Sequence, residues 1–368
     1  MLSRSPAGGM KRRRVNRAGQ GGMWLESPAA PPPVRHGALR FALAMAVAMS
    51  HMGFQPGGFN PGVMAVMVFY LLAGMVADKL LSLPAFASPV PYWVNRLRRI
   101  APLYLFSLAV AAVAWGCGAS SIFLARDPGP VDILANLTVI PLAYYMYTGQ
   151  DAFTLIPPAW SLGVELQFYL LAPLLLTRPR MLRWLLWSSF VVFLFAVVGK
   201  LHTDHFGYRL LPGVLFVFLG GVLLNRGRHG DAFARRTLLL LWLGLAFMAM
   251  WVVSYGQRVP YNYEMLAALL AGGPLLFFFS SSLPYRVDRF LGALSYGVFL
   301  LHFPALWFVS LTGCRYSLLA SLILSVVLAI FGHFLVEGPA RDFPRYAREV
   351  SSRLSSKIFS GKDEFLKK

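Results

Sequence analysis

The sequence contains little charge and almost no cysteine. Only 13% of its 368 residues are charged, whereas 57% are hydrophobic, well above the apolar content of a soluble domain. With only two cysteines, Cys117 and Cys314, the chain cannot form a framework of several disulfides. A single disulfide between the two and a simple packing role for each both remain open, and thiol catalysis is not expected. The sequence also lacks a P-loop, a dinucleotide-binding glycine motif and an internal repeat. The composition therefore predicts a polytopic membrane protein.

Apolar stretches long enough to span a bilayer account for most of the chain. We predict an all-α single bundle of ten transmembrane helices at about 38–54, 62–83, 100–125, 160–177, 183–199, 209–225, 237–254, 264–280, 290–311 and 317–336. The apolar piece 133–147 is short and broken by Pro141, which indicates an interfacial or re-entrant segment.

Acidic residues are scarce: 15 Asp and Glu stand against 34 Lys and Arg, a formal net charge of +19. The basic residues gather in alternate loops, at Arg96, Arg98, Arg99, Arg178, Arg180, Arg183, Arg226, Arg228, Arg235, Arg236, Arg286 and Arg289. The positive-inside rule then places both termini in the cytoplasm. Anionic lipid accounts for the charge, so no nucleic-acid partner is expected.

The two ends of the chain differ from the apolar bundle. Residues 1–37 are rich in Gly, Pro, Ala and Arg and are predicted to be a disordered basic tail; residues 341–368 form a second basic tail, leaving 38–340 as the membrane domain. The first apolar stretch resembles a signal peptide, but its removal would place every later loop on the wrong side of the membrane, so we expect it to be retained.

Arg40 and His51 lie eleven positions apart in the first predicted helix. Eleven helical steps place both on one face, separated along the axis by about 16 Å. Polar groups at membrane depth are costly and face a bundle interior or a cavity, which indicates a site. The alternative is that Arg40 reaches the headgroups and His51 only ends the helix.

Glu165 lies one turn inside the fourth predicted helix, after Trp160 and Ser161 at the interface. Trp160 alone would be an ordinary interfacial aromatic and Ser161 an ordinary helix cap. A carboxylate at this position needs a partner, and His51 is expected at a similar depth. A Glu165–His51 pair would fix the imidazole tautomer and raise its basicity, as general-base catalysis requires.

Arg96 and Arg99 are spaced to face one way at the inner mouth of the third predicted helix, a fork suited to phosphates; a plain positive-inside flank is the alternative. His302 alone would be a packing histidine rather than a reactive one. His202 and His205 flank an acid, yet nothing nearby completes a metal site, and we predict no metal.

Together these strings resemble the acyltransferase-3 family of bacterial membrane O-acyltransferases over about residues 36–340. The resemblance rests on Arg40 with His51, FYLLAG at 69–74, Arg96-x-x-Arg99-x-x-Pro102-Leu-Tyr104, Trp160-Ser161-Leu162 with Glu165, Phe168 and Tyr169, Ser295-Tyr296 with His302, and Glu337 with Pro339. Relatives usually carry an acid where this chain has Met67, so we assign the second helix no catalytic role.

The resemblance implies transfer of an acyl group, often acetyl, from cytoplasmic acyl-CoA to a hydroxyl outside the inner membrane. It implies that His51 is catalytic and that Arg40, Arg96 and Arg99 serve donor binding or activity. We expect Glu165 to stabilise the His51 imidazolium; a His-acyl intermediate is the rival mechanism. Trp160, Ser161, Tyr169, Ser295, Tyr296, His302 and Glu337 are expected to support the site.

The preferred acceptor is an exopolysaccharide or its lipid-linked precursor, and polysaccharide synthase or export proteins are candidate partners. Two other classes remain open: a glycolipid transporter with a polar path through Arg40, His51 and Glu165, and a non-catalytic subunit of a polysaccharide synthase complex. The sequence decides neither the acceptor, the acyl length nor the oligomeric state.

Overall fold

The computed structural model describes residues 35–314 and 317–339. Within these ranges the chain is helical, and the only β pairing is an isolated bridge between Leu124 and Phe153. The predicted tails, 1–37 and 341–368, lie almost wholly outside the described residues, so their disorder stays a prediction. Cys117 and Cys314 are both free and exposed, which excludes a disulfide between them and a packing role in the core.

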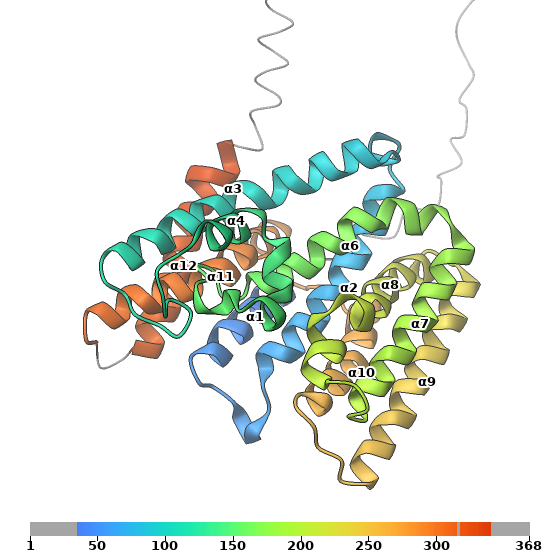
Figure 1. The fold of residues 1–368 in the computed structure, drawn as a ribbon. Coiled ribbons are helices and arrows are strands. Elements are labelled where there is room, and N and C mark those ends of the chain that lie inside the picture. The colour runs from blue at the N-terminus through green and yellow to red at the C-terminus, as the bar shows by residue number, and fades with distance from the viewer. Residues whose placement is uncertain (1–34, 315–316, 340–368) are drawn as a thin grey trace, which may run out of the picture. The chain divides into compact units, whose positions relative to one another are not determined.

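The long helices follow the predicted apolar stretches (Figure 1). Those of the described ranges are α1 (Gly37–His51), α2 (Pro61–Leu81), α3 (Pro89–Gly116), α6 (Ala159–Thr177), α7 (Pro179–Val197), α8 (Leu211–Arg228), α9 (Ala232–Ser254), α10 (Asn262–Phe278), α11 (Tyr285–Leu311) and α12 (Ser317–Gly332). The largest difference is at α3, which begins at Pro89 rather than near residue 100. Hydropathy misses its first turns because they carry the basic run Arg96–Arg99.

Eight helices of the described chain are long and apolar enough to cross a membrane. They confirm an all-α polytopic membrane protein. The apolar helices α1 and α10 have 15 and 17 residues. At 1.5 Å per residue each is shorter than the roughly 30 Å hydrocarbon core. The count of ten spans and the cytoplasmic position of the termini therefore stay predictions.

The segment between α3 and α6 is broken into short pieces, as its sequence predicts. It contains α4 (Pro130–Thr138), the 3₁₀ turn η3 (Ile140–Tyr144) and α5 (Tyr145–Thr148). The break falls at Val139, whose φ of 68° lies in the left-handed region that a β-branched residue rarely adopts. This segment packs against the first turns of α6 and covers the end where α6 begins.

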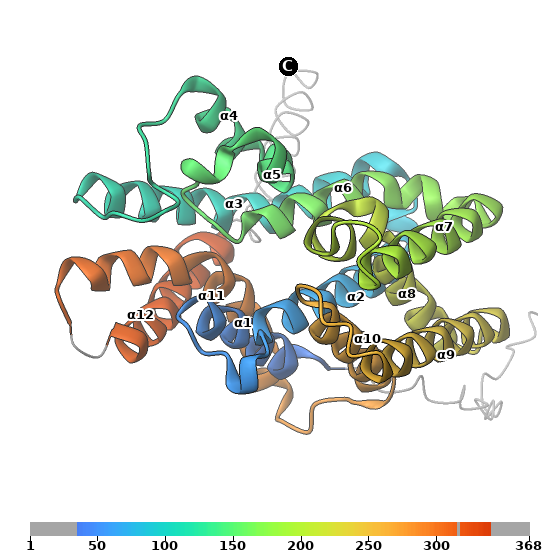
Figure 2. The same ribbon diagram turned by 60° about the horizontal axis from the view of Figure 1, so that its bottom comes forward.

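Helix α2 lies at the centre of the packing, between α1, α8 and α10 (Figures 1 and 2). Its crossing with α8 depends on two glycines. A Cβ atom on Gly74 would lie 1.8 Å from the carbonyl oxygen of Phe218, and one on Gly221 would lie 1.9 Å from that of Leu71. The FYLLAG string therefore ends in glycine because two helix backbones touch there.

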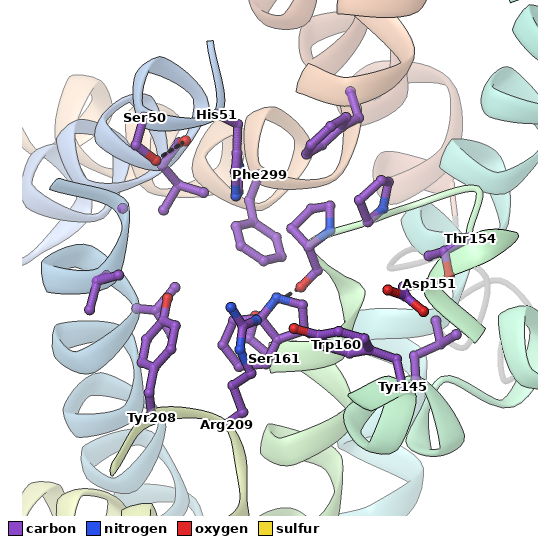
Figure 3. A pocket seen from close by; sticks show the side chains of 18 of the residues that line it. Ser50, His51, Tyr145, Asp151, Thr154, Trp160, Ser161, Tyr208, Arg209 and Phe299 are labelled. Carbon is purple, nitrogen blue, oxygen red and sulfur yellow. Dashed lines mark hydrogen bonds between the residues drawn. The ribbon is translucent and has the colours of Figure 1, made fainter. Parts of the chain in front are cut away.

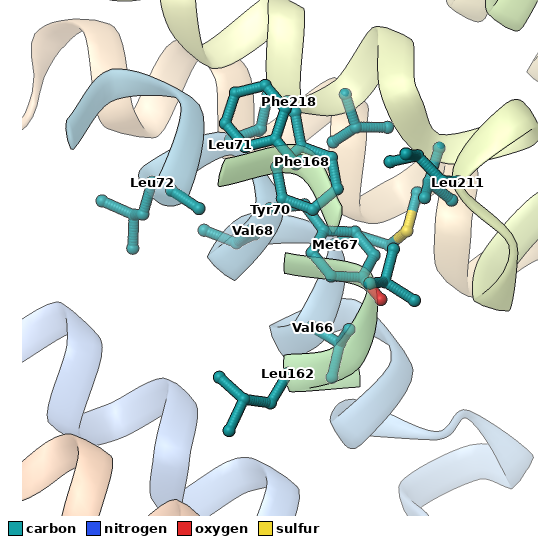
Figure 4. Close-up of a cluster of buried hydrophobic side chains, with 14 of the residues drawn as sticks. Val66, Met67, Val68, Tyr70, Leu71, Leu72, Leu162, Phe168, Leu211 and Phe218 are labelled. Atoms are coloured by element: carbon teal, nitrogen blue, oxygen red, sulfur yellow. The ribbon is translucent and has the colours of Figure 1, made fainter. Parts of the chain in front are cut away.

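An aromatic stack fills the space between α2, α6 and α8 (Figure 4). The rings of Phe168 and Phe218 are stacked with centroids 4.5 Å apart, and the ring of Tyr70 is tilted against Phe218 with centroids 4.5 Å apart. Phe168 and Phe218 have no exposed surface. This rigid cluster fixes the position of α6 against α2, and both helices line the cavities described below.

Four of the described helices, α3, α6, α10 and α11, contain an internal proline, and in α6 and α10 the freed carbonyl accepts from an indole. Pro173 in α6 cannot bond to the carbonyl of Tyr169, which accepts instead from the indole of Trp93 at 3.2 Å. Pro274 in α10 likewise cannot bond to the carbonyl of Leu270, which accepts from the indole of Trp242 at 3.1 Å. These bonds satisfy polar groups that would be costly to leave unpaired in an apolar environment.

Candidate functional site

Two cavities lie among the same four helices, α1, α2, α6 and α11. We call the first, of about 290 Å³, the arginine cavity; its polar lining includes Arg40, Arg96, Arg99, Glu165, Tyr169, Ser295 and Tyr296. We call the second, of about 240 Å³, the histidine cavity; its polar lining includes Ser50, His51, Asn60, Tyr145, Asp151, Trp160, Tyr208 and Arg209. Most residues predicted from sequence thus divide between these two cavities, whereas His302 and Glu337 line neither of them.

Helix α3 brings Arg96 and Arg99 to the arginine cavity as the spacing of three predicts. Arg98, between them in sequence, is exposed and does not line the cavity. Arg40 reaches the same cavity from α1. Three guanidinium groups from two helices therefore converge, an arrangement suited to an anion with several negative oxygens.

Two tyrosines and one acid hold Arg96 and Arg99 in place. The guanidinium of Arg96 lies 5.6 Å from the ring centroid of Tyr169, and that of Arg99 lies 5.5 Å from the ring centroid of Tyr296. Arg99 also forms an ion pair with Glu337. The Nε atom of Arg96 is buried and has no hydrogen-bond partner among the described residues. An unpaired buried donor of this kind favours a ligand that can accept from it.

Glu337, which does not line the arginine cavity, pairs with one of its arginines, Arg99. It ends the π-helical segment η6 (His333–Glu337), accepts from His333 Nδ1 at 2.9 Å and is only 3% exposed. The neighbouring Tyr296 hydroxyl donates to the carbonyl of Ile100 at 3.2 Å, and Ser295 donates to Gly292 at 2.8 Å. Tyr296 and Glu337 thus join α11 and η6 to α3 around Arg99, whereas the Ser295 bond stays within α11.

The predicted pairing of Glu165 with His51 is wrong. Glu165 lines the arginine cavity, where its Oε1 accepts from the Tyr169 hydroxyl at 2.5 Å, whereas His51 lines the histidine cavity. The depth estimate failed because Glu165 is one turn further into α6 than Trp160 and Ser161, which do reach the histidine cavity. The carboxylate is surrounded by arginines instead.

The partner of His51 is His302. His51 Nδ1 lies 3.0 Å from His302 Nε2, and the two rings are within 3° of parallel. His302 Nδ1 lies 3.2 Å from the carbonyl of Val298, which can only accept, so this nitrogen carries the proton. His302 Nε2 then accepts from His51 Nδ1–H. The remaining nitrogen, His51 Nε2, keeps its lone pair, as in a base oriented by a third group.

Arg209 faces His51 from the opposite side of the histidine cavity (Figure 3). Its Nε donates to both carboxylate oxygens of Asp204 at 2.9 Å, and its guanidinium lies 4.4 Å from the ring centroid of Trp160. Tyr208 and Tyr145 also flank it, at 5.2 and 5.4 Å. An arginine held by an acid and three aromatic rings is rigid, and it places a positive charge opposite the imidazole.

Sequence reasoning missed this arginine. It has no role assigned from the sequence, and Asp204 enters there only as the acid between His202 and His205. In the structure both belong to the π-helical segment η5 (Thr203–Arg209), and the carboxylate of Asp204 forms an ion pair with Arg209. The tryptophan that supports Arg209 is 49 positions away in sequence, so no local motif could reveal the group.

Trp160 and Ser161 take different places from those of an interfacial aromatic and a helix cap. Both are buried, and α6 begins before them at Ala159. Ser161 does not cap the helix; its hydroxyl donates to the carbonyl of Pro158 at 3.0 Å. Both line the histidine cavity, and Ser161 lines the arginine cavity as well.

Comparison with known proteins identifies the family of the chain. The model of a family described as an acyltransferase domain matches residues 37–337, which include every residue of both cavities. No solved structure matches the chain significantly.

Three curated relatives match parts of the chain. An uncharacterized protein of Aquifex aeolicus is 33% identical over 185 residues, 49% of this chain and 84% of its own length. "Putative peptidoglycan O-acetyltransferase YrhL" of Bacillus subtilis is 24% identical over 85% of this chain, and the match spans 56% of that protein. "Nodulation protein 10" of Rhizobium leguminosarum bv. viciae is 27% identical over 75% of this chain and 81% of that protein.

Proposed function

This chain belongs to the acyltransferase-3 family of membrane O-acyltransferases, and from that premise we propose that it moves an acetyl group from cytoplasmic acetyl-CoA to a polysaccharide hydroxyl across the membrane. Membership sets aside the transporter and the non-catalytic subunit. The donor, the acceptor and the direction of transfer are the content of the proposal.

The arginine cavity is the proposed donor site. Coenzyme A carries phosphates, and guanidinium groups bind phosphate oxygens with charge-assisted hydrogen bonds. Arg40, Arg96 and Arg99 supply those groups, and the unpaired Nε of Arg96 offers a further donor. In the absence of donor, Glu165 offsets part of their positive charge. Positively charged loops at this end of α3 support a cytoplasmic orientation.

The histidine cavity is the proposed site of transfer. Arg40 and His51 lie on one helix about 16 Å apart along its axis, which is half or more of a bilayer's hydrocarbon thickness. An extended thioester arm can follow α1 from the arginine cavity to His51 while the phosphates stay bound. The acyl group then crosses the membrane without release of the donor.

His51 is the proposed general base. Its Nε2 takes the proton of the acceptor hydroxyl while the hydroxyl oxygen bonds to the acyl carbon. The C–S bond breaks, and the proton passes from His51 to the departing thiolate. His302 fixes the tautomer of His51 by accepting from its Nδ1–H. Arg209, on the opposite side of the cavity, stabilises the negative oxygen of the tetrahedral intermediate.

The acceptor is proposed to be an exopolysaccharide or its lipid-linked precursor. Aromatic rings beside Asp151 and the Asp204–Arg209 pair combine apolar and hydrogen-bonding surface, as a sugar requires. The name of the Bacillus relative refers to peptidoglycan, whose glycan strands are polysaccharide. We place the protein in the bacterial inner membrane, beside synthase or export proteins that supply the glycan.

The observation that carries this proposal is the His51–His302 pair opening onto a cavity that continues the arginine cavity along the same helices. It is tested with inverted membrane vesicles given radiolabelled acetyl-CoA outside, at their cytoplasmic face. Label should appear on lumenal glycan with the natural protein and not with His51→Ala.

His229→Ala is the matched control, because His229 is exposed and lies outside both cavities. It should transfer label at the natural rate. Full transfer by well-inserted His51→Ala would overturn the assignment of the base, and transfer that requires lumenal acetyl-CoA would overturn the direction.

A further inference from the structure

The two cavities meet at three shared residues. Val66 of α2, Ser161 of α6 and Phe299 of α11 line both of them, and every other lining residue belongs to one cavity alone. Three helices therefore each contribute one side chain to the boundary between the cavities.

The helical registers place these residues midway between the two cavities. On α11, Tyr296 lines the arginine cavity, Phe299 both and Phe303 the histidine cavity. These positions are three and four apart, so each step is about one helical turn along a single face. On α2 the order is reversed along the chain: Val63 lines the histidine cavity, Val66 both cavities and Tyr70 the arginine cavity. The boundary is thus a short constriction on a continuous path.

The constriction has a largely apolar surface. Val66 and Ser161 are 5% and 7% exposed, and the Ser161 hydroxyl is engaged with the carbonyl of Pro158. The Phe299 ring is half-buried. It contacts Phe69 edge-on, with centroids 6.3 Å apart, and lies tilted against His302, with centroids 6.4 Å apart. Such a surface suits a methylene chain better than water.

The histidine cavity differs in this respect. Asn60, Asp151 and Arg209 give it enough hydrogen-bonding groups to hold water when no sugar occupies it. Water at His51 would compete with the acceptor, because the same base can activate it against the thioester. The product would then be acetate and free coenzyme A, with the water oxygen bonded to the acyl carbon and the C–S bond broken.

We propose that Val66, Ser161 and Phe299 form a narrow aperture through which the thioester arm passes to reach His51, and that this aperture holds the thioester away from water of the histidine cavity while no acceptor is bound there. This rests on the proposed donor and transfer sites. Phe299 is the residue that closes the aperture, because its ring is the largest of the three side chains. Its role is to exclude water and to position the arm, and it takes no part in proton transfer.

The test measures acetate release from radiolabelled acetyl-CoA by purified protein in proteoliposomes without acceptor, together with acetyl-CoA affinity. Phe299→Ala should raise acetate release about tenfold, because a closed site protects a reactive intermediate from hydrolysis. Phe299→Leu should give a smaller rise. Phe299→Trp should lower transfer in vesicles. The acetyl-CoA affinity of each variant is measured so that acetate release is compared at equal occupancy of the donor site.

Phe308→Ala is the matched control, since Phe308 is a half-buried phenylalanine of the same helix that lines neither cavity. It should release acetate at the natural rate. The aperture is refuted if Phe299→Ala and Phe299→Leu bind acetyl-CoA normally and release no more acetate than the natural protein. Failure of the proposed function looks different, because the natural protein itself would then neither bind nor cleave acetyl-CoA.

Discussion

His51 and His302 are 251 positions apart in sequence, yet their rings are parallel within 3° and joined by a 3.0 Å contact between Nδ1 and Nε2. The carbonyl of Val298 fixes the proton of His302, and His302 in turn fixes that of His51. The free nitrogen of His51 is therefore the one that can act as a base.

The first prediction concerns this pair. His302→Leu should lower acetyl transfer about tenfold to a hundredfold, the effect of losing one hydrogen bond to a group that becomes charged. His302→Gln should recover part of the rate, because its amide oxygen can accept from His51 Nδ1–H. Initial rates in membrane vesicles measure both, and equal rates for Leu and Gln would show that His302 acts by packing alone.

The second prediction separates the arginines of α3. Arg96→Ala and Arg99→Ala should each weaken acetyl-CoA binding by about tenfold or more, since each removes a charge-assisted contact to phosphate. Arg98→Ala removes an equal charge from the same helix turn. Because Arg98 is exposed and lines neither cavity, acetyl-CoA binding should not change. Calorimetric titration in detergent provides the values. Equal weakening by all three would instead indicate a general surface potential.

The third prediction tests the place of Glu165. Glu165→Gln keeps an acceptor for Tyr169 but removes the charge that offsets the arginines, so the ligand-free protein should lose about 1–3 kcal/mol of stability. Bound coenzyme A should restore much of that loss, because its phosphates replace the carboxylate. Thermal unfolding with and without coenzyme A measures this difference. If Glu165 acted on His51, transfer would fall and the ligand-induced stabilisation would stay as in the natural protein.

The fourth prediction concerns the α2–α8 crossing. Gly74→Ala should destabilise the protein by about 1–3 kcal/mol or more, because its Cβ would overlap the Phe218 carbonyl and the helices would have to separate. Gly116→Ala, at the end of α3, meets no atom within 4 Å and should be neutral or slightly stabilising. Unfolding in detergent compares the two. Equal melting temperatures would show that the crossing can relax.

The sequence by itself determined the class of protein, the helices and the residues that share a helix face. Hydropathy placed ten apolar stretches because burial in lipid acts on each stretch separately. The spacings of Arg40 with His51 and of Arg96 with Arg99 follow from the helical repeat, a local property. The family resemblance came from short motifs of the same kind, and it is confirmed.

Only the tertiary structure decided which helix faces meet. It gave His51 a histidine of α11 as partner, turned Glu165 toward the arginines and brought Arg209 beside Trp160. A difference of one turn along a helix, about 5.4 Å, decides which cavity a side chain enters. That offset depends on close contacts between helices, such as Gly74 against Phe218, and no window along a single stretch of sequence contains them.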